Sequence, residues 1–163
     1  MDYIVPDVLD YNLKILFCGT APSRISAKML CYYGNKNNKF WKTLFEVGFT
    51  DKLIRPVEYT KLLEYRFGLT DLVKNNSGND EDIEINEEHQ KDFEYKIMKY
   101  NPKIIAFTSK NAAYFYFRKK LHYGLQKIKI FNSKVFVLPS TSPLASKFWD
   151  ISYWEQLKDL SNG

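Results

Sequence analysis

The fold is decided by residues 13–41, LKILFCGTAPSRISAKMLCYYGNKNNKFW. This stretch opens with a short apolar run, about residues 13–18, which has the length and composition of a buried parallel strand and breaks at Gly19. Ligands bind at the carboxyl ends of strands in an open α/β sheet, so the loop GTAPSRIS is where a site is expected. The next segment, YYGNKNNKFW, mixes aromatic rings with a glycine and asparagines, which suits neither a plain core nor a plain surface.

The rest of the chain alternates between helical and strand-like patterns. Helical patterns cover about 38–47, the residues after Pro56, 93–100, 111 to near Gly124, and about 153–160. Apolar runs predict strands at 103–107 and 135–138, and a strand or extended segment at 67–73. This alternation predicts an α/β fold of three layers, α/β/α, with a central mostly parallel sheet and a single domain over residues 1–163.

The charge distribution is uneven. The whole chain has a formal net charge of +5, but residues 80–94 contain eight carboxylates and only one base, Lys91. Of the 24 basic and 19 acidic residues, 23 and 11 lie outside this acidic patch, which leaves +12 on the rest of the chain. A positive charge of this size favours a polyanionic partner, although the charge could also serve solubility alone. We expect the acidic patch to lie away from the surface that binds such a partner, because its carboxylates would repel phosphate.

Cysteine usage and hydropathy exclude several classes of protein. Cys18 and Cys31 form no CxxC pair, so no zinc site or iron–sulfur cluster is indicated, and we expect no metal or organic cofactor. The first residues, MDYIVPDVLDYN, lack the features of a signal peptide, and no window approaches 18 apolar residues. We therefore expect an intracellular monomer, cytoplasmic or nuclear, that does not associate with a membrane.

Three polar loops follow candidate parallel strands. They are GTAPSRIS, TSKNAA after KIIAF, and PSTSPLAS after VFVL. If the strands are parallel, the three loops share one edge of the sheet. That edge is rich in hydroxyl groups, which bind phosphates without reading sequence, although such loops are also common as ordinary turns.

These segments resemble motifs of the uracil-DNA glycosylase superfamily, most closely its mismatch-specific branch acting on G·U and G·T pairs. FCGTAPSRIS resembles the first motif, a strand that runs into a G-x-x-P-G/S loop. YYGNKNNKFW resembles the segment in which an N-x-F-W tetrad places an aromatic ring under the flipped base. VLPSTSPLAS resembles the second motif, whose loop pushes a residue into the DNA stack. Order, spacing and flanking strands agree over most of the chain.

The resemblance implies a mechanism in which the damaged nucleotide is turned out of the duplex into a pocket. An apolar side chain can fill the resulting gap, and Leu144 in the second motif is the candidate wedge, with a core leucine as the alternative. The surrounding loop residues and two nearby lysines are expected to contact DNA. These DNA-binding candidates are Ser142, Pro143, Leu144, Ser146, Lys110 and Lys147.

The resemblance also assigns residues to the base pocket. Phe40 is the expected stacking ring, because base–aromatic stacking contributes about 1–3 kcal/mol, while Trp41 would point into the core. The alternative is that both rings belong to the core. Tyr33 resembles the bulky residue of the pocket wall that excludes a larger base. The remaining substrate-binding candidates are Gly19, Ser23 and Ser140.

Hydrolysis needs donors aimed at the leaving base and a placed water. We expect the backbone N–H groups of Thr20 and Ala21 to act as donors. In the mismatch-specific branch an asparagine that positions water stands where this chain has Ala21. Asn38 and Asp71 are therefore the candidates for this role, and helix capping is the alternative for each.

The resemblance predicts a monofunctional DNA glycosylase of base-excision repair, a hydrolase whose partner is DNA with a damaged or mismatched base. Uracil is the first candidate base, followed by hypoxanthine, xanthine and mispaired thymine. A second hypothesis is a catalytically impaired domain that binds DNA or protein, which Ala21 favours and the aromatic pocket opposes. A nucleotide-binding α/β module is a third, but neither G-x-G-x-x-G nor GxxxxGK[ST] occurs.

Overall fold

The protein is built around a five-stranded sheet with the strand order β2-β1-β3-β5-β4. The computed structural model describes all 163 residues. β1 pairs in parallel with β2 and β3, and β3 pairs in parallel with β5, whereas β4 is antiparallel to β5. The expected mostly parallel sheet is confirmed. The strands are β1 (Ile15–Gly19), β2 (Phe67–Asp71), β3 (Ile104–Phe107), β4 (Gly124–Ile130) and β5 (Ser133–Val137).

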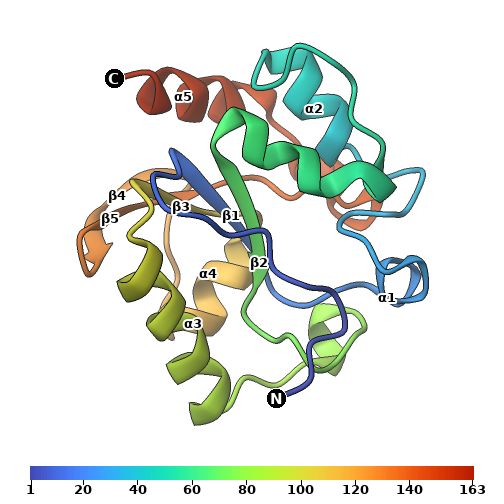
Figure 1. Cartoon of the computed structure of the whole chain (residues 1–163), viewed down its shortest axis with the longest axis vertical. Helices are drawn as coiled ribbons and strands as arrows, with labels where there is room; N and C mark the ends of the chain where they lie inside the picture. Colours follow the sequence, from blue (N-terminus) through green and yellow to red (C-terminus); the bar gives the residue numbers. More distant parts are fainter.

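Helices cover both faces of the sheet, which confirms the three-layer α/β/α arrangement. In Figure 1, α2 and α5 lie on one side of the sheet, and α3 and α4 lie on the other. The α-helices are α1 (Arg24–Met29), α2 (Phe40–Val47), α3 (Glu87–Tyr100), α4 (Lys110–Phe117) and α5 (Ile151–Ser161). Three 3-10 segments complete the chain: η1 (Pro56–Tyr65), η2 (Asp80–Asp82) and η3 (Pro143–Phe148).

The alternation of side chains along β1 explains the two cores. Ile15 and Phe17 point into the core that includes α2 and α5, and Leu16 and Cys18 point into the core that includes α3 and α4. All four are fully buried, as a strand covered on both faces requires. Phe17 stacks on Trp154 of α5, with ring centroids 6.1 Å apart. Both cysteines are buried free thiols, and no helix is both long and apolar enough to cross a membrane.

Several elements differ from the sequence-based expectations. α3 begins at Glu87, inside the acidic patch, because Asn86 caps it by accepting a hydrogen bond from the backbone N–H of His89. The residues after Pro56 form a 3-10 helix, and α4 ends at Phe117 instead of near Gly124. The short helix α1 and the strand β4 were not predicted, since neither has a clear hydrophobic period.

β4 is the outer strand at one edge of the sheet, and its pairing with β5 is irregular. The register shifts between Leu125 and Lys129, as at a β-bulge. Most of its side chains are exposed, including those of Lys127 and Lys129.

The N-terminal segment closes the opposite edge of the sheet. Val8 and Leu69 of β2 exchange two backbone hydrogen bonds of 2.9 Å, and the N–H of Ile4 donates to the carbonyl of Lys74 at 2.8 Å. Gly68 makes this approach possible, because a Cβ atom there would lie 2.5 Å from the carbonyl oxygen of Val8. Residues 4–8 are therefore fixed against β2 and the loop that follows it.

Candidate active site

The three polar loops and the YYGNKNNKFW segment meet at the carboxyl edge of the parallel strands. The hydroxyl of Tyr33 lies 2.9 Å from Oγ1 of Thr108, which follows β3. The backbone N–H of Lys39 donates to the carbonyl of Thr141, in the loop after β5, at 3.0 Å. Gly19 and Asp71 are paired in register at the ends of β1 and β2. Segments far apart in sequence are thus joined at one rim.

Asp71 is the acidic group at this rim. The residue is only 4% exposed, and its side chain accepts no hydrogen bond from the protein. Burial raises the pKa of this carboxyl group to about 6, although Lys74 and Lys96 act in the opposite direction. A general base works best when its pKa lies near the working pH. A buried carboxylate that has no protein donor and a pKa of about 6 is therefore suited to accept a proton.

Gly19 sets how closely the first loop approaches Asp71. A Cβ atom at Gly19 would lie 2.6 Å from Oδ1 of Asp71 and 3.3 Å from the hydroxyl oxygen of Tyr33, so a larger residue would displace one of them. The following N–H groups, of Thr20 and Ala21, donate no hydrogen bond within the chain. Two unpaired backbone donors therefore follow directly after the residue that lies against the carboxylate.

Tyr33 covers the expected stacking ring. The rings of Tyr33 and Phe40 are stacked, with centroids 4.0 Å apart and planes 19° from parallel. Phe40 has no exposed surface and lies in the core between Phe17 and Trp154, so no base can stack on it in this conformation. Tyr33 itself is half-buried and has a φ of 52°, which is unusual for a residue with a bulky side chain. Trp41 is buried in the core, as expected.

Asn38 has a structural role just before α2, although the N-cap residue of this helix is Lys39. Its Oδ1 accepts a hydrogen bond of 2.9 Å from the backbone N–H of Phe40, at the start of α2. The amide nitrogen of the half-buried Asn38 side chain donates no hydrogen bond within the chain and remains available to a ligand. By contrast, Asp71 caps no helix.

The second-motif loop presents an exposed apolar tip. Leu144 is 83% exposed, which excludes the alternative that it is a core residue. It lies in η3, whose start is fixed by Ser142: the Ser142 hydroxyl accepts a hydrogen bond from the Leu144 N–H at 3.2 Å. Pro143 and Ser146 are exposed on either side, and the Ser140 hydroxyl accepts from the N–H of Ser142.

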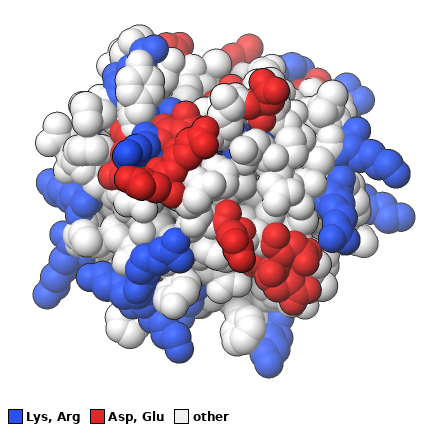
Figure 2. Space-filling view, turned by 90° about the horizontal axis from the view of Figure 1, so that it is seen from below, with Lys and Arg blue, Asp and Glu red and all other residues white.

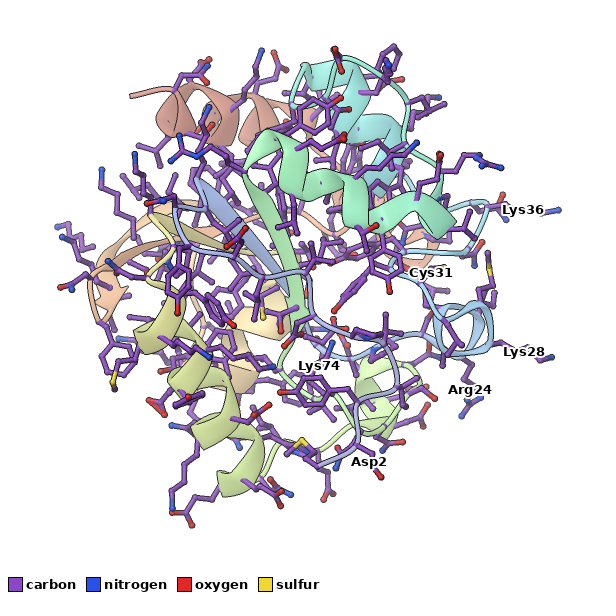
Figure 3. All side chains as sticks on the ribbon, in the orientation of Figure 1. Asp2, Arg24, Lys28, Cys31, Lys36 and Lys74 are labelled. Carbon is purple, nitrogen blue, oxygen red and sulfur yellow. The ribbon has the colours of Figure 1, made fainter.

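The other predicted contacts lie around the rim. Ser23 caps α1 and is exposed, so its hydroxyl already accepts from the N–H of Ser26. Lys110 begins α4, with its ammonium 4.2 Å from the ring centre of Tyr123, and Lys147 lies over the ring of Phe148. Three further basic side chains, which no sequence pattern singled out as contacts, project outwards from the edge near α1 in Figure 3: Arg24, Lys28 and Lys36.

The acidic patch is split between two places. Figure 2 shows separate clusters of acidic side chains on one face, with Lys and Arg along its edges. Asp82 forms an ion pair of 3.4 Å with Arg24 of α1, and Asp80 accepts a hydrogen bond from Asn111 of α4. η2 is therefore tied to two of the rim loops, so this part of the patch lies beside the rim, and the expectation that the patch lies away from the DNA-binding face stays a prediction. The remaining carboxylates lie on or near α3.

Two surface cavities lie at the opposite end of the strands. One, of about 320 Å³, lies between Lys14, Phe49 and Lys158, and the other, of about 250 Å³, lies between Lys14, Lys103 and Lys134. Neither includes a residue of the rim. No three His, Cys, Asp or Glu side chains come together in a way that could hold a metal ion.

Comparisons with known proteins agree with this architecture. The family model of the Uracil DNA glycosylase superfamily matches residues 6–159. The chain is also similar to the solution NMR structure of a candidate uracil DNA glycosylase from Methanosarcina acetivorans, with a TM-score of 0.68 and 24% sequence identity. That match covers 97% of this chain and 95% of the other. At this level of identity the likeness establishes a common fold.

Proposed function

Because this chain belongs to the uracil-DNA glycosylase superfamily, we propose that it is a monofunctional DNA glycosylase that removes uracil from DNA and leaves an abasic site. Members of this superfamily are hydrolases that act on DNA. The observation that carries the proposal is the Asp71 carboxylate, which lies unpaired at the rim beside Gly19 and the free N–H groups of Thr20 and Ala21.

Asp71 is the proposed base for the attacking water. The N-glycosidic bond breaks with its electron pair leaving on the base, water adds to the sugar carbon, and Asp71 takes the proton that the water loses. Before that transfer, the negative charge of Asp71 stabilises the positive charge that develops on the sugar. With a pKa of about 6, the carboxyl group is mostly ionised at pH 7, so activity is expected to fall as the pH drops below about 6.

Three donors are proposed to hold the base and stabilise the charge that moves onto it. The backbone N–H groups of Thr20 and Ala21 suit the carbonyl oxygens of a pyrimidine, and the free amide of Asn38 supplies a further donor. This assignment keeps Asn38 in the pocket as a binding residue, because its oxygen already accepts a hydrogen bond from the N–H of Phe40.

Tyr33 is proposed to leave its position when the base enters. Its ring lies parallel to Phe40, as an everted base would, and its hydroxyl is hydrogen-bonded at the rim. Rotation of the Tyr33 side chain would expose Phe40 for stacking. Leu144 would fill the gap in the duplex, because its exposed side chain is free to enter the stack.

The test is incubation of the protein with a duplex that contains one uracil, followed by alkali to break abasic sites. We expect strand breakage by the wild type and a loss of about 100-fold or more for Asp71→Asn. Parallel duplexes with hypoxanthine, xanthine and a G·T mismatch measure base preference. Intact DNA with every substrate, together with tight binding of the same duplexes, would instead support a domain that binds DNA without catalysis.

Monofunctional action has its own readout. Without alkali, the product should remain an unbroken strand that carries an abasic site, because a lyase would require a lysine to attack the sugar. Borohydride should therefore trap no covalent complex between the protein and the DNA.

A further inference from the structure

A buried ionic network is hydrogen-bonded to Thr70 and Tyr32, the chain neighbours of the rim residues Asp71 and Tyr33. Asp7 stands between two buried lysines: its Oδ1 is 3.0 Å from Nζ of Lys74, and its Oδ2 is 2.7 Å from Nζ of Lys96. The side chains of Lys74, Lys96 and Asp7 are 1%, 6% and 9% exposed. Figure 3 shows Lys74 inside the molecule, near the end of β2. Burying charged groups is costly, so such a cluster calls for an explanation beyond stability.

Hydrogen bonds complete the network and fix its geometry. The Lys74 ammonium donates to the hydroxyl of Tyr32 at 2.7 Å, and Lys96 lies 3.2 Å from Asp92. Thr70, the neighbour of Asp71 in β2, donates to Oδ1 of Asp7 at 2.7 Å. Each charged group therefore has a partner, while Asp71 alone has none.

The members of the network come from different parts of the chain. Asp7 lies in the N-terminal segment that is fixed against β2, Lys74 follows β2, and Lys96 lies in α3. Three separate elements thus place charges behind one carboxylate. The sequence signal was weak, since Lys74 comes after the apolar run FGLTDLV and looks like the start of an ordinary polar loop.

Six titratable groups from the elements packed around Asp71 interact electrostatically with it. Burial and the charge of Asp71 raise the pKa values of Cys18, Tyr32 and Tyr33, which keeps these three groups neutral. The groups that carry charge near Asp71 are those of the network. These six groups are Cys18 in β1, Tyr32 and Tyr33 before α2, Lys74, Lys96 and Asp7.

We propose that Asp7, Lys74 and Lys96 are positioning residues that set the ionisation of Asp71. The lysines favour its carboxylate form, and Asp7 offsets part of their charge. This inference rests on the proposed role of Asp71 as the base. It adds that the N-terminal segment, through Asp7, takes part in tuning the site.

The network predicts shifts of opposite sign for two of its members. Lys74→Met removes a positive charge and should raise the pH at which Asp71 titrates, whereas Asp7→Asn removes a negative charge and should lower it. Each shift should be about half a pH unit or more. A merely structural role would weaken the fold in both variants without moving the two midpoints apart.

The measurement is an NMR titration of the Asp71 side-chain carboxyl carbon in the wild type and in each variant. Tyr32→Phe is the matched control, because it removes a hydrogen bond to Lys74 without changing any charge, and its midpoint should equal that of the wild type. If Lys74→Met does not fold, Lys96→Gln replaces it, because this variant also removes a positive charge and should also raise the pH at which Asp71 titrates. The acid limb of the pH–rate profile for uracil excision should move in the same directions.

The outcomes separate this inference from the proposed function. The titration needs no enzymatic activity, so a wild type that leaves uracil in place would overturn the proposed function and not the network. If Asp71 titrates with the same midpoint in the wild type, in Asp7→Asn and in the lysine variant, the inference is overturned, even in an active enzyme. Shifts of the same sign in both charge variants would overturn it as well.

Discussion

Replacing Asp71 with asparagine should make the protein more stable while removing its proposed base. The pKa of Asp71 rises from 3.8 to about 6 on folding, chiefly because burial penalises the charged form. The folded protein therefore binds this proton more tightly than the unfolded chain does. Its free energy of unfolding should fall as the pH rises from about 4 to about 6 and then stay at the lower level.

The size of the effect follows from the same shift. A difference of about two pKa units corresponds to about 3 kcal/mol at pH 7.5, which Asp71→Asn should recover because the amide carries no charge. For a protein of this length, that gain raises the melting temperature by about 6–12 °C. Buried and only 4% exposed, Asp71 is little screened by solvent.

Urea unfolding of the wild type and Asp71→Asn between pH 4 and pH 8 measures this gain. The advantage of the variant should be largest above pH 7 and should shrink towards zero near pH 4, where the wild-type carboxyl group is also neutral. Asp159→Asn, at an exposed aspartate of α5, is the control and should change little. A variant that is no more stable than the wild type at pH 7.5 would refute the reasoning.

Three further substitutions test the pocket and the wedge. Leu144→Ala should leave the free energy of unfolding within about 0.5 kcal/mol of the wild-type value, because the side chain is exposed. It should slow excision from duplex DNA more than excision from single-stranded DNA, and equal slowing of both would contradict the wedge role. Tyr33→Ala should raise the ratio of thymine to uracil excision at least about tenfold, because it empties the space beside Phe40, and an unchanged ratio in paired rate measurements would exclude this role. Phe40→Ala should cost about 3–5 kcal/mol in urea unfolding, since the ring is fully buried; a smaller loss would show that the ring is not part of the core.

The sequence predicted the parallel strands well because their signal is local. β1 and β3 are continuous apolar runs that end in small or polar residues, and both lie at the centre of the sheet. β4 was missed for the opposite reason. As an edge strand it carries exposed lysines, so its pattern resembles a basic loop until β5 is known to pair with it.

The meeting of the rim loops could be predicted, because it follows from strand direction. The roles given to Leu144 and Asp71 come from the family resemblance and stay predictions. The stacking of Tyr33 on Phe40 could not be predicted, because it depends on a left-handed backbone conformation that no sequence pattern announces. The ionic network behind Asp71 joins three distant segments and was equally invisible.

The shifted register of β4 also affects how separate molecules meet. An outer strand with regular, unpaired backbone groups invites the strand of a neighbour to add to it, which is the first step of many aggregates. Here the irregular pairing distorts that strand, and the like charges of Lys127 and Lys129 would repel a second copy. At the other edge of the sheet, Val8 already pairs with Leu69 and so occupies part of the free edge of β2. Both flanks of the sheet are thus guarded against intermolecular strand addition, by charge and distortion on one side and by the chain's own backbone on the other.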